Sequence, residues 1–149
     1  MVDGLLEKAA TTDRKRVCFD LRTSARDGSQ RMLNALLPGT EVAVHRHPNS
    51  NVDVVCLRGR MAVVIYSEEG DEADRILLDP AAGSFGCVVP IGTWHTVEVF
   101  EPSVIHEAKD GGYGRDGSEN FADYKARMGC GGLRPVTLDC IGVLKKDIE

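Results

Sequence analysis

The stretch that decides the fold reads Gly39-Thr40-Glu41-Val42-Ala43-Val44-His45-Arg46-His47, and Pro90-Ile91-Gly92-Thr93-Trp94-His95 complements it later in the chain. In a β-strand, successive side chains alternate between the two faces, so His45 and His47 share one face. A third imidazole from a later strand, His95, would complete a facial set of nitrogen ligands for a divalent transition metal. The pattern therefore predicts that His45, His47 and His95 bind a metal.

Short β-type segments separated by turn residues extend on both sides of this stretch. The expected strands cover 15–20, 30–37, 41–47, 52–58, 60–67, 74–79, 85–89, 94–100 and 103–109. Turn signals such as Pro38-Gly39 and Arg58-Gly59 lie between them, and no helical pattern interrupts the series. Many short strands at this spacing predict an all-β sandwich or barrel.

The two ends of the chain differ from this central pattern. We expect an N-terminal arm or short helix over residues 1–13, one domain over 14–127 and a C-terminal extension over 128–149. Residues 120–127 have the composition of a helical turn or two. The apolar stretch 136–143 is expected to form a final strand, or to pack on the barrel or on a partner subunit. Because exposed sheet edges need covering, we expect a homodimer, with this tail as a candidate exchanged strand.

Composition bounds the class of protein. The 149 residues are 42% hydrophobic and 28% charged, which is typical of one soluble globular domain. A net charge of −5 argues against a nucleic-acid partner. No apolar run approaches the roughly 18 residues of a membrane span, and the first residues lack a signal-peptide pattern. Five widely spaced cysteines without a Cys-x-x-Cys favour reduced thiols. We therefore expect a cytoplasmic protein without a membrane partner.

The histidine motifs resemble those of a known superfamily. Gly39 followed by His45-x-His47, and then Pro90-x-Gly92-x-x-His95, is similar to the two motifs of the cupins. The similarity is greatest to the WbuC-type cupin-fold metalloproteins and covers roughly residues 14–127. It includes the segments 29–36, 45–48, 56–60, 92–96 and 109–113. The resemblance implies a cupin-type antiparallel double-sheet barrel, or jelly roll, that binds a metal, and it implies no defined reaction.

The chain departs from the family pattern at one ligand. The family spacing places a glutamate at Val52, or at Asn51 with the shorter spacing that cupins also allow. Asp53 would point to the opposite face unless the strand bulges, and Asn51 offers only an amide oxygen. We therefore expect the three histidines to be the whole protein-derived ligand set, with water or an exogenous anion as the fourth ligand. Zinc, iron, nickel, manganese and cobalt are all candidate metals.

Four polar residues are candidate pocket residues. Gln30 and Asn34 lie on one face of an expected strand, where their amides either line the pocket or pair with neighbouring backbone. Glu41 shares the face of His45 and is a base or an outer ligand at the mouth, or else a solvated edge charge. Asn51 completes the set.

Two classes of function fit these residues. One is a metal-dependent enzyme that acts on a small polar substrate, sugar-like or carboxylic. The alternative is a non-catalytic cupin module that binds a metal or a small molecule with a degenerate ligand set. The catalytic residues are not identified by the sequence, because cupins host many unrelated activities.

Overall fold

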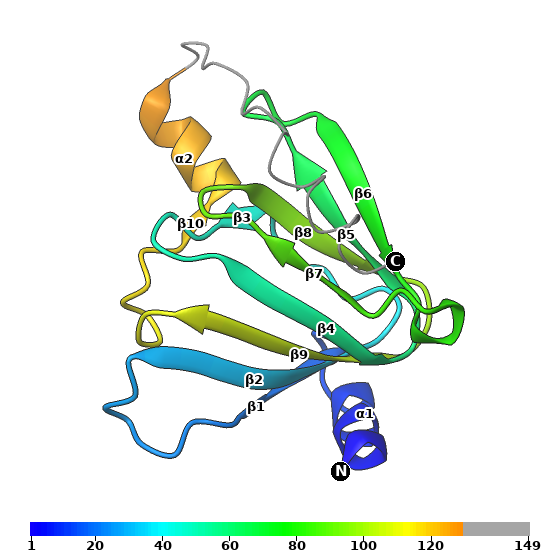
Figure 1. Ribbon diagram of the computed structural model, residues 1–149. Helices are drawn as coiled ribbons and strands as arrows, with labels where there is room; N and C mark the ends of the chain where they lie inside the picture. The colour runs from blue at the N-terminus through cyan, green and yellow to red at the C-terminus, as the bar shows by residue number, and fades with distance from the viewer. Residues whose placement is uncertain (130–149) are drawn as a thin grey trace.

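The computed structural model describes residues 1–129 and consists of two five-stranded antiparallel sheets that face each other (Figure 1). The first sheet has the order β1-β2-β9-β4-β7, and the second has the order β10-β3-β8-β5-β6. The strands of the first sheet are β1 (Arg16–Asp20), β2 (Ser29–Leu36), β9 (Ser103–Asp110), β4 (Val52–Arg58) and β7 (Gly86–Val89). Those of the second are β10 (Glu119–Asn120), β3 (His45–Arg46), β8 (Trp94–Val99), β5 (Met61–Tyr66) and β6 (Glu72–Leu78). The prediction of an all-β antiparallel double sheet is confirmed.

The core lies between the two sheets and follows the period-2 pattern of the strands. In β4, the buried residues Val52, Val54 and Cys56 alternate with exposed ones. They pack with Met61, Val63 and Ile65 of β5 and with Ile105 of β9 in one hydrophobic cluster. One face of each sheet is thus removed from water, which fixes which side chains point into the barrel.

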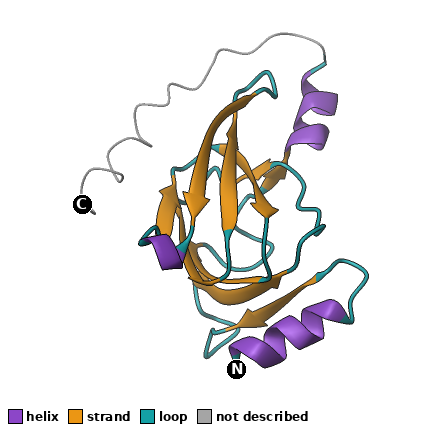
Figure 2. Cartoon of the chain, turned by 90° about the vertical axis from the view of Figure 1, so that its right-hand side faces the viewer, coloured by secondary structure: helices purple, strands orange, loops and turns teal. Residues whose placement is uncertain are grey.

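Two helices and a 3₁₀ turn (Pro80–Ala82) accompany the sheets. Helix α1 (Val2–Ala10) packs Leu5 and Ala9 against Leu33 and Val104 on the outer face of the first sheet. Helix α2 (Phe121–Met128) begins at Asn120, whose side chain accepts a hydrogen bond from the backbone of Ala122. Figure 2 shows the two helices at opposite ends of the molecule. No helix among residues 1–129 is long and apolar enough to cross a membrane.

Strand β3 is shorter than the sequence predicts. Its ladder covers only His45–Arg46, whereas an expected strand ran over 41–47. The backbone that precedes β3 forms hydrogen bonds outside the ladder. The Val42 carbonyl accepts from the Thr96 hydroxyl, and the Val44 carbonyl accepts from the Phe121 amide. Because these groups are satisfied by a side chain and by the start of α2, the segment needs no ladder partner.

The loop between β4 and β5 requires glycine. Gly59 has φ +93°, and a Cβ built on it would lie 2.4 Å from the Pro102 carbonyl oxygen. A left-handed turn and a close backbone contact therefore coincide at this position. The turn joins β4 of the first sheet to β5 of the second.

Candidate metal centre

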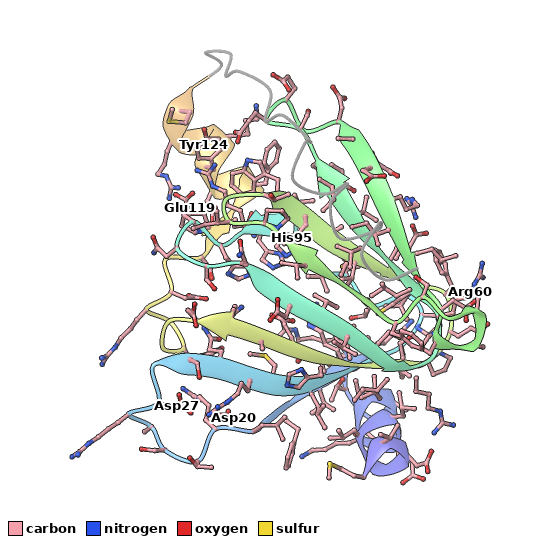
Figure 3. All side chains as sticks on the ribbon, viewed as in Figure 1. Asp20, Asp27, Arg60, His95, Glu119 and Tyr124 are labelled. Carbon is pink, nitrogen blue, oxygen red and sulfur yellow. The ribbon has the colours of Figure 1, made fainter. Side chains whose placement is uncertain are left out.

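Strands β3 and β8 bring the three predicted histidines together. His45 pairs directly with His95 across the antiparallel ladder. His47 follows β3, and its carbonyl accepts a 2.9 Å hydrogen bond from the Gly92 amide of the turn before β8. One ring nitrogen of each histidine lies within 4.8 Å of the other two. His47 and His95 are buried and His45 is partly buried. Figure 3 shows His95 toward the end of the barrel that carries α2.

Backbone carbonyls set the tautomers of two of these histidines. His45 Nδ1 lies 2.9 Å from the Ala43 oxygen, and His95 Nδ1 lies 2.9 Å from the Thr93 oxygen. A carbonyl oxygen only accepts, so each Nδ1 must carry the proton and donate it. The lone pair is therefore left on Nε2, which is the state required of an imidazole ligand.

A carboxylate relay orients the third histidine. His47 Nδ1 lies 2.8 Å from Ser118 Oγ, which donates a 2.7 Å hydrogen bond to Asp116. Asp116 is buried and also accepts a 3.1 Å bond from the Gln30 amide. Since the Ser118 proton is directed to Asp116, the hydroxyl oxygen accepts from His47 Nδ1–H. His47 thereby keeps its Nε2 lone pair as well, through a carboxylate partner of the kind that supports metal-bound histidines.

Burial keeps all three imidazoles neutral at pH 7. Desolvation is the main cause in each case, and it lowers the pKa of His95 to about 3 and that of His47 to about 4. The pKa of His45 is lowered for the same reason. Neighbouring charge from Lys109 adds to the effect at His47. The deprotonated imidazole is the form that binds metals.

A cavity of about 320 Å³ opens beside His45 and His95. Its polar lining includes Arg14, Arg16, Asn34 and Glu107, and the exposed side chain of Tyr113 lies at its edge. The apolar lining includes Leu36, Val52, Val54, Val63, Val97 and Ile105. The volume is at the lower end of the range of small-molecule sites.

Glu107 and Lys109 are two residues of the site that the sequence argument missed. They alternate with Ile105 along β9, and this spacing was the available signal for a common inward face. Lys109 Nζ lies 3.3 Å from Glu107 Oε1 and 3.4 Å from His47 Nε2, and 3.7 Å from Asp116 Oδ2. The Lys109 side chain is only 10% exposed, so an ammonium group is enclosed beside the three histidines.

The two predicted amides take different positions. Asn34 lines the cavity and donates a 3.1 Å hydrogen bond to Glu107 Oε2. Gln30 does not line this cavity: it is buried, and its amide donates to Asp116 and to the Gly111 carbonyl. Asn34 therefore lies where a bound molecule would be, whereas Gln30 acts on the site through Asp116.

The remaining candidates lie outside the cavity or supply no donor atom. Glu41 is exposed, and its backbone oxygen accepts a 2.5 Å bond from Arg16 Nη1. Asn51 is also exposed, and its side-chain oxygen accepts a 2.8 Å bond from the Ile91 amide. Val52 forms part of the cavity wall, where the family pattern would have a glutamate.

Comparison with known proteins gives a family and a fold. A family model described as "Domain of unknown function (DUF6016)" matches residues 1–78. No curated protein matches the sequence significantly. Among solved structures, protein SO0799 from Shewanella oneidensis is similar, with a TM-score of 0.59 and 17% identity over 83% of this chain and 87% of that one.

Two further structural relatives identify the fold type. Recombinant oxalate oxidase in complex with glycolate gives a TM-score of 0.58 at 14% identity, over 93% of this chain and 74% of that one. A cupin-2 domain protein from Rhodospirillum rubrum gives 0.57 at 14% identity, over 77% and 71% of the two chains. At these identities the likeness shows the cupin fold and carries no activity across.

Proposed function

The chain belongs to the DUF6016 family and has a cupin fold, and we propose that it holds a divalent transition metal through His45, His47 and His95. The observation that carries this proposal is the state of the three rings. Each Nδ1 is hydrogen-bonded, and one ring nitrogen of each neutral imidazole lies within 4.8 Å of the other two. Val52 supplies no ligand atom, so the set resembles the three-histidine sites that leave a coordination position open.

Metal analysis tests the proposal. Protein purified without a histidine tag is stripped with a chelator and dialysed separately against zinc, iron(II), manganese, nickel and cobalt. We expect one equivalent of at least one metal in the wild type, and less than a tenth of that in His47→Ala and His95→Ala. His106→Ala is the matched control, because His106 does not line the cavity and should leave the metal content unchanged. Folded wild-type protein that takes up none of the metals would refute the proposal.

Catalysis is the second candidate function, and Glu107 favours it. A bound divalent metal polarises oxygen groups of a substrate or lowers the pKa of water. Glu107 lines the same cavity, and Asn34 and Lys109 hold its carboxylate in place. A carboxylate fixed in this way can take a proton from a bound molecule or return one. We therefore propose a metal-dependent enzyme acting on a small carboxylic or sugar-like substrate.

A substrate screen separates the enzyme from a binding module. Metal-loaded protein is assayed for consumption of small sugars, hydroxy acids and keto acids, with and without oxygen. We expect turnover that falls by about 10²-fold or more in Glu107→Gln, within the usual contribution of general acid–base catalysis. Glu101→Gln, an exposed carboxylate away from the cavity, is the control. Ligand binding without turnover in the wild type would favour the non-catalytic module.

Subfamily and cellular location extend the proposal. We propose a WbuC-type cupin on the motif segments quoted above. We propose a cytoplasmic location on the cysteine pattern of the sequence, in which five widely spaced cysteines include no Cys-x-x-Cys.

A further inference from the structure

Two arginines that line the cavity, the exposed Arg14 and the partly buried Arg16, have no acidic partner among the described residues. Within residues 1–129, neither Arg14 nor Arg16 forms an ion pair, although both line the cavity. Arg16 is partly buried and donates one hydrogen bond, to the Glu41 backbone oxygen. Burial, together with the charge of Arg14, lowers the pKa of Arg16. A desolvated, uncompensated cation attracts an anion from solution.

The other charged groups at the cavity do not neutralise the positive charge of these two arginines. Glu107 is the acidic residue in the lining, and Lys109 lies 3.3 Å from its carboxylate. Asn34 donates to the same carboxylate. The negative charge of Glu107 is therefore already compensated, whereas Arg14 and Arg16 are not. The chain has a net charge of −5, yet the described lining of this cavity includes two arginines and one carboxylate.

The walls of the cavity suit an aliphatic body better than a sugar. Val52, Val54, Val63 and Ile105 offer only hydrocarbon surface. The Asn34 amide already donates to Glu107, so it is less available to sugar hydroxyls. Hydroxyls enclosed without partners would disfavour binding, whereas methylene groups gain from leaving water.

We propose that the cavity binds a small monocarboxylate with a short aliphatic body. Arg16, assisted by Arg14, donates hydrogen bonds to the carboxylate, and the aliphatic body packs on the apolar walls. The inference rests on the proposed function, because His45 and His95 line the same cavity and locate the metal beside this ligand. It narrows the substrate class from small polar molecules to amphipathic carboxylates.

Calorimetric titration with three probes tests the inference. Hexanoate, hexanamide and galactose are titrated into the full-length protein, both chelator-treated and loaded with zinc. We expect hexanoate to bind at least tenfold more tightly than the other two probes in both forms. In Arg14→Gln/Arg16→Gln, the affinity for hexanoate should fall at least tenfold and that for hexanamide should stay within about threefold. Arg58→Gln, an exposed arginine outside the cavity, should match the wild type.

Two results would overturn the ligand class: hexanoate that binds no better than hexanamide or galactose, or equal hexanoate affinity in the double variant and the wild type. Zinc titration of the same preparations keeps the proposed function separate. A wild type that binds zinc but shows no carboxylate preference refutes this inference alone. A wild type that takes up none of the five metals refutes the metal proposal, while an arginine-dependent preference for hexanoate would still support the ligand class.

Discussion

Val52 and Lys109 lie opposite each other across β4 and β9, and together they change the charge beside the three histidines. The cupin pattern has a carboxylate at the first position, and this chain has a methyl-bearing side chain there. The neighbouring strand then contributes an ammonium group 3.4 Å from His47 Nε2. A cation at this distance opposes a dication, so the centre should bind metal more weakly than one completed by a carboxylate.

Replacing Lys109 with methionine tests this electrostatic effect. Lys109→Met keeps most of the side-chain length and removes the charge, so the dissociation constant for zinc should fall by about tenfold. Competition with a chelating dye measures it. Lys125→Met is the control, because Lys125 lies in α2 over the Phe121 ring and does not line the cavity, so this variant should bind zinc like the wild type. Unchanged or weaker zinc binding in Lys109→Met would show that the ammonium does not oppose the metal.

The buried histidines also predict how stability depends on pH. Their folded-state pKa values lie near 4 for His47 and near 3 for His95, below the ordinary 6.5. Below pH 6.5 these histidines bind protons in the unfolded chain but not in the folded protein. The free energy of unfolding therefore falls as the pH decreases from 6.5 toward 4 for His47 and toward 3 for His95. Each histidine contributes a slope of up to about 1.4 kcal/mol per pH unit.

Urea denaturation of chelator-treated protein at pH 7 and pH 5 measures this loss. The interval lies above the ordinary pKa values of carboxyl groups, so the histidines dominate it. The wild type should lose roughly 2–4 kcal/mol. His47→Gln removes one such histidine, so the free energy of unfolding of this variant should fall less between pH 7 and pH 5 than that of the wild type. Equal losses in both proteins would contradict the assignment.

At the scale of elements, Arg46 contacts helix α2 and the strand next to it. The Arg46 guanidinium stacks 4.4 Å from the ring of Trp94 and 4.6 Å from that of Tyr124. It also pairs with Glu119 and with buried Glu68. In Figure 3, Tyr124 lies on α2 and Glu119 lies just below it. Because Arg46 precedes His47, the same contacts join the helix to the candidate metal centre.

Removing this guanidinium should loosen the helix. Arg46→Met leaves Glu68 without its cationic partner and abolishes two cation–π contacts, so the free energy of unfolding should drop by about 2–4 kcal/mol. Urea denaturation measures the change. Arg127→Met removes an exposed arginine that also pairs with Glu119, and it should cost less than about 1 kcal/mol. Similar losses in the two variants would rule out a special role for Arg46.

At the scale of the whole molecule, each sheet formed by residues 1–129 has two edge strands, and each of these is paired on one side only. β1 and β7 are the edges of the first sheet, and β10 and β6 are those of the second. Leu57 and Phe85 are 49% and 53% exposed at the margin of β4 and β7. Apolar side chains next to an open edge favour association with another chain.

Truncation tests the predicted homodimer. The expected exchanged tail, residues 136–143, lies outside the described residues. Light scattering should give twice the chain mass for the full-length protein and the single-chain mass for a protein ending at residue 128. Truncation elsewhere, before Val2, should leave the dimer intact. A dimer that survives removal of residues 129–149 would refute the tail exchange.

Local pattern alone predicted much of this protein. Alternating apolar residues and turn signals indicated the strands, because burying one face of a sheet imposes period 2. The spacing of His45 and His47 put them on one face, and the motif at His95 added the third ring. These features depend on residues near one another in sequence, or on a motif that can be identified without knowing its neighbours in the fold.

Tertiary structure alone decided how the site is completed. Asp116 and Ser118 reach His47 from about seventy residues away. Lys109 reaches the same ring because the register of β9 against β4 sets it opposite Val52. Sheet register and loop closure decide which distant residues come into contact, and neither follows from the alternation of side chains along a single strand. The sequence by itself thus determined most of the strands and the three rings, and the fold determined the extent of β3 and the charges that surround the rings.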